Sequence, residues 1–181
     1  MIKRVNAYFS LASLALIAVH VIYELFAYIT MYYNPVLSAL VSYIPATIIV
    51  THAIISIICV IFLNDSIKIL YKSMNRETVL QRVSAFLMVI LLPVHIVSYN
   101  LLESSAGSVG YIVTEIAQVI FYMSLYTHIA VSVSKAFVTL GFLDDDRRRK
   151  RIDVFAMIIC GIMFIITAVI ILTSHSKMFL Y

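Results

Sequence analysis

The run VLSALVSYIPATIIVTHAIISIICVIFL, residues 36–63, contains 28 residues and no Asp, Glu, Lys or Arg. A helix needs about 20 consecutive apolar residues to cross the roughly 30 Å hydrocarbon core of a bilayer. The run therefore predicts a membrane-spanning helix, and its one histidine, His52, lies near the middle of that helix. Four further apolar runs of comparable length occupy residues 5–33, 78–102, 111–143 and 152–174.

The composition is that of a membrane protein. Of the 181 residues, 63% are hydrophobic and 12% are charged, and the mean hydropathy is +1.04. Soluble proteins average roughly 45–50% apolar and about 25% charged residues, which excludes a disordered chain, a nucleic-acid-binding module and an ordinary cytosolic enzyme. The apolar runs are too long for the strands of a membrane β-barrel and lack their alternation. We expect an all-α integral membrane protein with five transmembrane helices in a single domain, residues 1–181.

The basic residues predict the orientation of the helices. With the N-terminus in the cytoplasm, 12 of the 13 Lys and Arg side chains fall on the inner side, and only Lys177 falls outside. Cytoplasmic loops of membrane proteins carry an excess of Lys and Arg. We therefore expect a cell-membrane protein with a cytoplasmic N-terminus and an external C-terminus. The densest charge cluster, DDDRRRKR at residues 144–151, suits contact with anionic membrane lipid or docking of a soluble partner.

Four consecutive predicted helices each carry one histidine near mid-membrane, namely His20, His52, His95 and His128. Ionisable side chains inside the hydrocarbon are costly and mark function by default. One such histidine is readily explained by a hydrogen bond to a neighbouring helix, whereas one in each of four helices favours a shared cofactor. The two cysteines, Cys59 and Cys160, show no CxxC or CxxCH spacing, so they indicate neither a redox pair, a zinc site nor covalently attached haem.

The depths of the four histidines form two layers. Measured from the centre of each predicted span, His20 and His95 lie toward the outside, and His52 and His128 lie toward the inside. Two facing histidines at one depth supply both axial ligands of a haem iron, and helix bundles build such sites from facing helices. Zinc or copper would favour three or four ligands at one level. We predict two b-type haems, the outer one on His20 and His95 and the inner one on His52 and His128.

Short motifs around these histidines resemble those of one family. The matching segments are Ala18-Val-His20, Thr51-His52-Ala, Val79-Leu-Gln-Arg-Val-Ser84 ahead of His95, and the helix of His128 that runs on to Thr139-Leu-Gly141 and a basic turn. The third segment is similar to the LQRVTG run of that family. The ordered set resembles the cytochrome b membrane-anchor subunit of succinate dehydrogenase or fumarate reductase, in its five-helix, two-haem type. The likeness extends over nearly all five helices.

This resemblance implies a four-helix haem-binding bundle with a fifth helix beside it. It also implies a flavoprotein and an iron–sulfur subunit docked on the cytoplasmic face, and electron transfer through two haem b groups to or from a membrane quinone of the menaquinone type. The chain has no Gly-rich nucleotide loop and no cysteine cluster, so we expect no substrate-oxidising activity from it alone. Two alternatives stay open: the cytochrome b anchor of another dehydrogenase, and a histidine-lined metal-ion or proton transporter.

Three polar residues near the inner helix ends are candidate contacts of the haem propionates, namely Arg82, Ser84 and Lys135. Guanidinium and ammonium groups pair well with carboxylates. The alternative for Arg82 and Lys135 is that their long side chains extend to lipid phosphates.

Glu24 is the candidate proton-transfer residue of a quinone site. It follows His20 by four residues, so on a helix it lies on the same face, one turn or ~5–6 Å farther out. Quinone chemistry couples two electrons to two protons, and a carboxyl group beside the outer haem would supply or accept them. Glu115, at a similar depth, would extend such a relay outward. The alternative is that Glu24 only accepts a hydrogen bond from a tyrosine or another helix.

Overall fold

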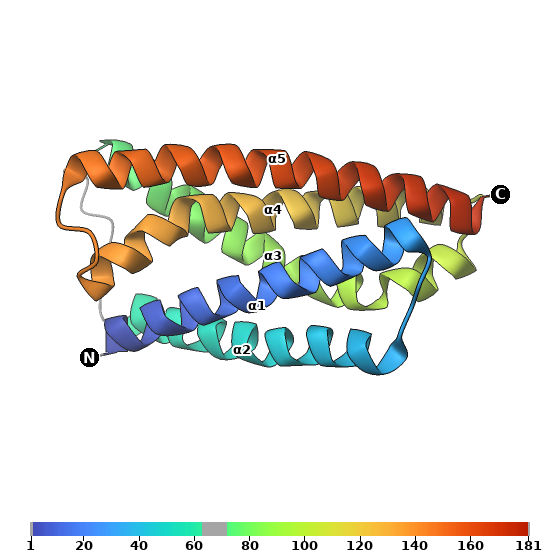
Figure 1. Cartoon of the computed structure of the whole chain (residues 1–181), viewed down its shortest axis with the longest axis horizontal. Coiled ribbons are helices and arrows are strands. Elements are labelled where there is room, and N and C mark those ends of the chain that lie inside the picture. Colours follow the sequence, from blue (N-terminus) through green and yellow to red (C-terminus); the bar gives the residue numbers. More distant parts are fainter. Residues whose placement is uncertain (1, 63–71, 181) are drawn as a thin grey trace. The chain divides into compact units, whose positions relative to one another are not determined.

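The computed structural model describes residues 2–62 and 72–180, and the regular elements in these ranges are all α-helices (Figure 1). The helices are α1 (Ile2–Thr30), α2 (Pro35–Phe62), α3 (Lys72–Ser104), α4 (Val109–Leu140) and α5 (Asp146–Phe179). Each of the five contains a stretch long and apolar enough to cross a membrane. The prediction of an all-α, five-helix, multi-pass membrane protein is confirmed.

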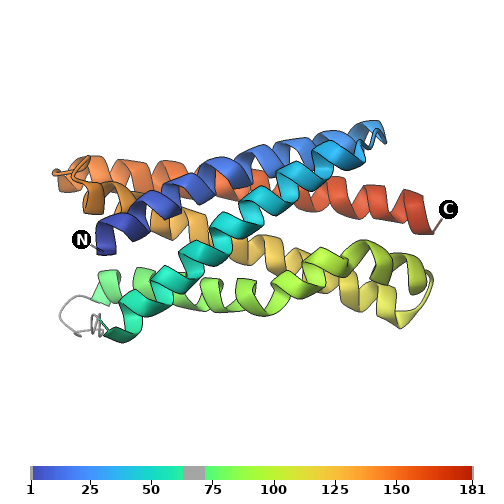
Figure 2. The same cartoon turned by 90° about the horizontal axis from the view of Figure 1, so that it is seen from below.

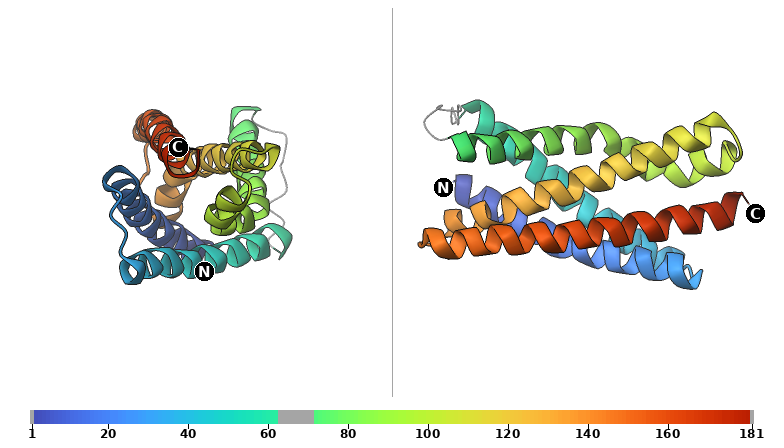
Figure 3. Two further views of the ribbon diagram at one scale, coloured as in Figure 1. Left: turned by 90° about the vertical axis from the view of Figure 1, so that its right-hand side faces the viewer. Right: turned by 90° about the horizontal axis from the view of Figure 1, so that it is seen from above.

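The described helices belong to two compact units. The first unit comprises Met1–Arg76 and Ser132–Phe155, and the second comprises Glu77–Val131 and Ala156–Tyr181. In the first unit α1 and α2 form an antiparallel hairpin whose helices lie side by side (Figures 1 and 2). In the second unit α3 and the first part of α4 form another antiparallel hairpin, and the later part of α5 lies along α4 (Figure 3). The expectation of a single domain stays a prediction.

The turn between α1 and α2 is held by one asparagine and one tyrosine. Asn34 Oδ1 accepts hydrogen bonds from the backbone N–H groups of Val36 and Leu37, both at 3.1 Å. Asn34 is therefore the N-cap of α2, with Pro35 at the first helical position that proline favours. The Tyr23 hydroxyl donates to the Asn34 carbonyl oxygen at 3.1 Å, which fixes the turn against α1.

The first helix ends at Thr30, three residues before the predicted boundary at residue 33. The backbone conformation and hydrogen bonds of the next residues explain this early end. Met31 has a left-handed φ of 54°, a conformation that a helix cannot continue through. The Thr30 hydroxyl accepts a hydrogen bond from the backbone N–H of Tyr32 at 3.3 Å. The residues before the Asn34-Pro35 pair thus belong to the turn.

The fourth helix ends at Leu140, also three residues before the predicted boundary. Gly141 follows with a φ of +83°. Its N–H donates to the Val138 carbonyl at 3.1 Å, and the Phe142 N–H donates to the Phe137 carbonyl at 2.9 Å. This double closure is the Schellman motif, and the contact between the Phe137 and Phe142 rings is the apolar pair that accompanies it.

The starts of α3 and α5 extend into sequence that we expected to be loop. The fifth helix begins at Asp146, six residues earlier than predicted, because Asp145 caps it: Asp145 Oδ1 accepts from the Arg147 N–H at 2.9 Å. The cluster at 144–151 is therefore mostly the first turns of α5. The third helix begins at Lys72, six residues before the predicted start at 78. Lys68, one of the basic residues used for the orientation, lies outside the described residues.

Candidate functional site

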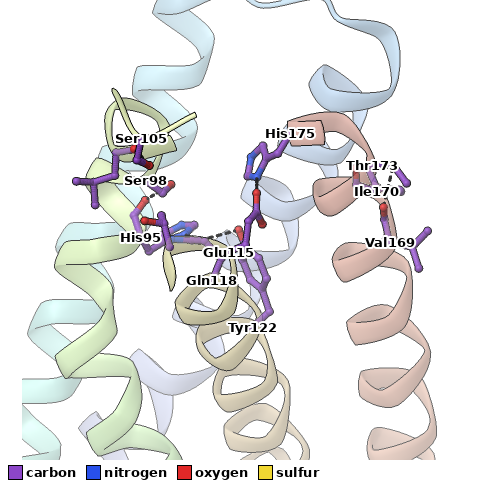
Figure 4. Close-up of polar contacts among 12 residues, drawn as sticks. His95, Ser98, Ser105, Glu115, Gln118, Tyr122, Val169, Ile170, Thr173 and His175 are labelled. Atoms are coloured by element: carbon purple, nitrogen blue, oxygen red, sulfur yellow. Dashed lines mark hydrogen bonds and ion pairs between the residues drawn. The ribbon is translucent and has the colours of Figure 1, made fainter. Parts of the chain in front are cut away.

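His95, on α3 in the second unit, is held by a buried amide of α4. Its Nδ1 lies 2.9 Å from Gln118 Oε1, and Gln118 is 1% exposed (Figure 4). The Gln118 amide nitrogen faces the Val94 carbonyl oxygen at 3.5 Å, and the Tyr122 hydroxyl donates to Oε1 at 3.0 Å. Oε1 is therefore the acceptor and the ring carries its proton on Nδ1. The other ring nitrogen, Nε2, then has the lone pair that a metal requires.

Aromatic rings of α4 also fix the plane of the His95 imidazole. Phe121 stacks on it with ring centroids 4.5 Å apart, and Tyr122 meets it edge-on at 5.8 Å. Hydrogen bonding and packing thus restrain the same ring. Such restraint of ring orientation is typical of metal-ligating histidines.

His128, on α4 in the second unit, is held by the main chain of α3. Its Nδ1 lies 3.1 Å from the Gln81 carbonyl oxygen and 3.4 Å from the Ser84 hydroxyl. A carbonyl oxygen only accepts, so Nδ1 of His128 carries the proton and Nε2 has the lone pair. The Ser84 hydroxyl donates to the Leu80 carbonyl at 2.7 Å. Ser84 is 4% exposed, and the 3.4 Å contact places its hydroxyl beside the His128 ring.

His20 and His52 belong to the first unit, where each ring faces the main chain of the other helix of the hairpin. His20 on α1 faces the backbone of Val41 on α2, and His52 on α2 faces the backbone of Asn6 on α1. The Asn6 side chain is tied to α2 as well, because the Ser56 hydroxyl donates to its Oδ1 at 3.0 Å. The Nδ1 of His52 is buried, with no hydrogen-bond partner among the described residues.

The histidines predicted to pair lie in different units. His20 and His52 are in the first unit, and His95 and His128 are in the second. The pairing of His20 with His95 and of His52 with His128 therefore stays a prediction. The four histidines lie one on each of α1, α2, α3 and α4, as the sequence indicated.

Glu24 makes a hydrogen bond within the first unit. Its Oε1 accepts from the Ser38 hydroxyl of α2 at 3.2 Å, and Ser38 is 8% exposed. The carboxyl group thus takes part in the α1–α2 contact, as the structural alternative for this residue expected. Arg82 on α3 and Lys135 on α4 are both half-buried, and their contact with propionates stays a prediction.

Sequence reasoning missed a buried ion pair in the second unit. The side chain of His175, four residues before the end of α5, is 2% exposed, and its Nδ1 lies 2.8 Å from Glu115 Oε1 (Figure 4). A signal was available in the sequence. Asp145 lies in the turn between α4 and α5, thirty residues after Glu115 and thirty before His175. Two antiparallel helices bring such equidistant residues to the same level.

Comparison of the chain with protein-family models, with curated proteins and with solved structures gives no match.

Proposed function

We propose that this chain is a dihaem cytochrome b that anchors a succinate dehydrogenase or fumarate reductase in the cell membrane. It would carry electrons between a cytoplasmic iron–sulfur subunit and a membrane quinone. The observation that supports this proposal most directly is the set of four mid-helix histidines, one on each of α1 to α4. The family itself is proposed from the quoted motifs alone.

The donor chemistry of the second unit fits haem ligation. His95 and His128 both carry their proton on Nδ1, where an acceptor on the facing helix binds it. In the neutral state each ring then has its lone pair on Nε2, the form that binds iron. Haem bound between such histidines supplies one-electron transfer. His20 and His52 would supply the other axial nitrogen of each haem.

The polar residues near His128 would serve that site in two ways. The Gln81 carbonyl holds the ring of His128 in one tautomer and orientation, and the Ser84 hydroxyl lies 3.4 Å from the same nitrogen. Arg82 lies on the same helix segment and would neutralise a propionate, because a guanidinium binds carboxylates through two N–H groups. Lys135 would do the same from α4.

The start of α5 would contribute to the docking surface for the soluble subunits. Five consecutive basic residues, 147–151, follow the Asp145 cap on the side proposed to be cytoplasmic. Cross-links from the iron–sulfur subunit should therefore fall on this segment. Cross-links that fall mainly on the loop at 103–110 would contradict both the orientation and the electron path.

A visible spectrum of the purified protein tests the proposal. The reduced-minus-oxidised difference spectrum should show b-type haem, and pyridine haemochrome analysis should give two haems per chain. One haem or none would overturn the two-haem proposal. A chain that carries no haem but transports metal ions or protons in vesicles would instead be the histidine-lined transporter. Co-purification of a flavoprotein and an iron–sulfur protein decides which dehydrogenase the chain anchors.

A further inference from the structure

The His175–Glu115 ion pair joins α5 to α4 within the second unit. The two side chains are 2% and 9% exposed, and both lie in stretches that qualify as membrane spans. The second carboxylate oxygen, Glu115 Oε2, is also buried and has no hydrogen-bond partner at normal distance among the described residues, although the Tyr111 hydroxyl, one turn earlier on α4, interacts with the same carboxyl group. A buried carboxylate oxygen without a partner is costly, and an ionisable pair inside a membrane protein is a functional site by default.

A second contact between the same two helices involves only neutral groups. The Tyr126 hydroxyl on α4 and the Thr167 hydroxyl on α5 lie 2.7 Å apart, and both residues are buried. This bond is neutral and cannot change its charge near neutral pH. The His175–Glu115 pair, by contrast, joins two ionisable groups.

The pair lies close to the group that holds His95. Glu115, Gln118 and Tyr122 follow one another at positions i, i+3 and i+7 of α4, so they share one face of that helix (Figure 4). Gln118 is the residue whose amide oxygen binds His95 Nδ1. One helical turn, about 5 Å, thus separates the pair from that amide. The charge of a haem held by His95 would lie beyond the imidazole, farther from Glu115 than this turn, and charges interact over longer distances where water is scarce.

We propose that the His175–Glu115 pair binds one proton in step with the gain of one electron at the haem held by His95. This inference rests on the proposed function, which supplies the electron from the iron–sulfur subunit or from quinol. When the electron arrives, Glu115 Oε2 accepts a proton from the aqueous phase. When the electron leaves, the same proton is released. The added negative and positive charges cancel, which favours both events in a low-dielectric interior.

The position of the pair gives the proton a short route to water. Glu115 lies six residues after the start of α4 and His175 four residues before the end of α5, which is roughly 6–9 Å of helix in each case. The ionisable groups that face the pair from the described helices include the buried Tyr111 hydroxyl of α4, one turn before Glu115. From α3, Tyr99 packs on Phe179, whose ring packs on His175.

The test is a redox titration of the two haems in the assembled complex, without quinone, over the pH range in which the complex is stable. In the wild type the midpoint potential of the His95 haem should fall as pH rises, approaching one proton per electron. Glu115→Gln keeps the shape of the side chain and its hydrogen bonds but cannot titrate. It should remove the pH dependence of this haem and leave the other haem unchanged.

Two further variants keep the test decisive. Tyr126→Phe breaks the neutral α4–α5 bond and is the matched control, so its pH dependence should equal that of the wild type. If the Glu115→Gln complex does not assemble, His175→Gln is used instead. In this variant the midpoint potential of the His95 haem should change over a different pH range from that of the wild type. The infrared difference spectrum between the reduced and oxidised wild type should also contain a carboxyl band that Glu115→Gln lacks.

Two outcomes would overturn the inference while leaving the proposed function intact. One is a wild-type potential of the His95 haem that does not change with pH. The other is a Glu115→Gln complex whose haem keeps the full pH dependence. A complex that contains no haem would overturn the proposed function itself, and the proton linkage with it.

Discussion

The two units restrain their histidines in different ways. In the second unit, Nδ1 of His95 and Nδ1 of His128 have acceptors at 2.9 Å and 3.1 Å on the facing helix. In the first unit, the rings of His20 and His52 face the main chain of the other helix, and Nδ1 of His52 has no hydrogen-bond partner among the described residues. The α3–α4 hairpin thus defines the tautomer of its histidines without any ligand.

This difference suggests how the proposed haem sites are assembled. A ring whose Nδ1 is bound to an acceptor keeps its Nε2 aimed in one direction, so little order is lost when iron binds. The buried Nδ1 of His52 has no such acceptor among the described residues, so iron would help to orient that ring. We therefore expect the histidines of the second unit to be oriented before haem binds. We also expect haem binding there to be more sensitive to substitution of the residues that hydrogen-bond to the histidines.

The largest expected effect comes from removing a ligand. His20→Ala and His95→Ala should each remove the same haem, and His52→Ala and His128→Ala should each remove the other. Each variant then retains one haem of two, because a bis-histidine iron loses an axial bond. Pyridine haemochrome analysis and redox titration measure this outcome.

The same measurement can break the comparison between the units. His175→Gln is the control, since His175 is bound to Glu115 and should not affect haem content. Retention of both haems after loss of His20 or His52 would show that the first unit supplies no ligand. Loss of both haems in every variant would show that the two sites are not independent.

A smaller effect should distinguish the two histidines of the second unit. His95 depends on a side chain, so Gln118→Leu should weaken haem binding at that site by about 10–100-fold, the usual cost of losing such a partner. His128 depends on the Gln81 carbonyl of the main chain, so Ser84→Ala should change haem binding little. The rate of haem transfer to an acceptor protein measures how strongly each variant holds its haem. Equal effects of the two substitutions would contradict the assigned hydrogen bonds.

Glu24 tests whether the first unit also contributes to quinone chemistry. Glu24→Gln preserves the hydrogen bond from Ser38 and removes the titration of the side chain. If Glu24 transfers protons at the quinone, quinone-linked turnover should fall and its pH profile should change, while both haem spectra stay normal. Turnover equal to the wild type across pH would show that Glu24 has a structural role. Ser38→Ala removes the hydrogen bond between Ser38 and Glu24 and tests that structural role separately.

The smallest expected effect concerns the residues with a positive φ that follow two helices, Gly141 after α4 and Met31 after α1. Gly141 has a φ of +83° with no atom within 4 Å of the position of an added Cβ, and Met31 has a φ of 54°. Gly141→Ala should lower the free energy of unfolding by about 1–2 kcal/mol, the usual cost of the left-handed conformation. Met31→Gly should raise it or leave it nearly unchanged, because glycine removes the strain but adds freedom to the unfolded chain. Thermal unfolding in detergent measures both.

Hydrophobic run length determined most of the fold. Five runs of 20 or more apolar residues cannot satisfy their backbone groups in a bilayer except as helices, and the structure has these five helices. The ends of the helices were predicted less accurately, because the length of an apolar run contains no information about the hydrogen bonds that cap a helix. Asp145 extends α5 into a charged segment, and Gly141 ends α4 inside an apolar one.

The sequence by itself determined the five membrane-spanning helices and the placement of one histidine in each of four of them. Only the tertiary structure decided which groups those histidines meet. Gln118 and Ser84 are ordinary polar residues in the sequence, and they become ring partners because α3 and α4 run antiparallel in contact. Likewise, Glu115 and His175 are sixty residues apart and form a pair only because α4 and α5 bring them to 2.8 Å. Hydropathy reports how each segment partitions between water and lipid, whereas these partnerships depend on the direction and register of helices that pack side by side.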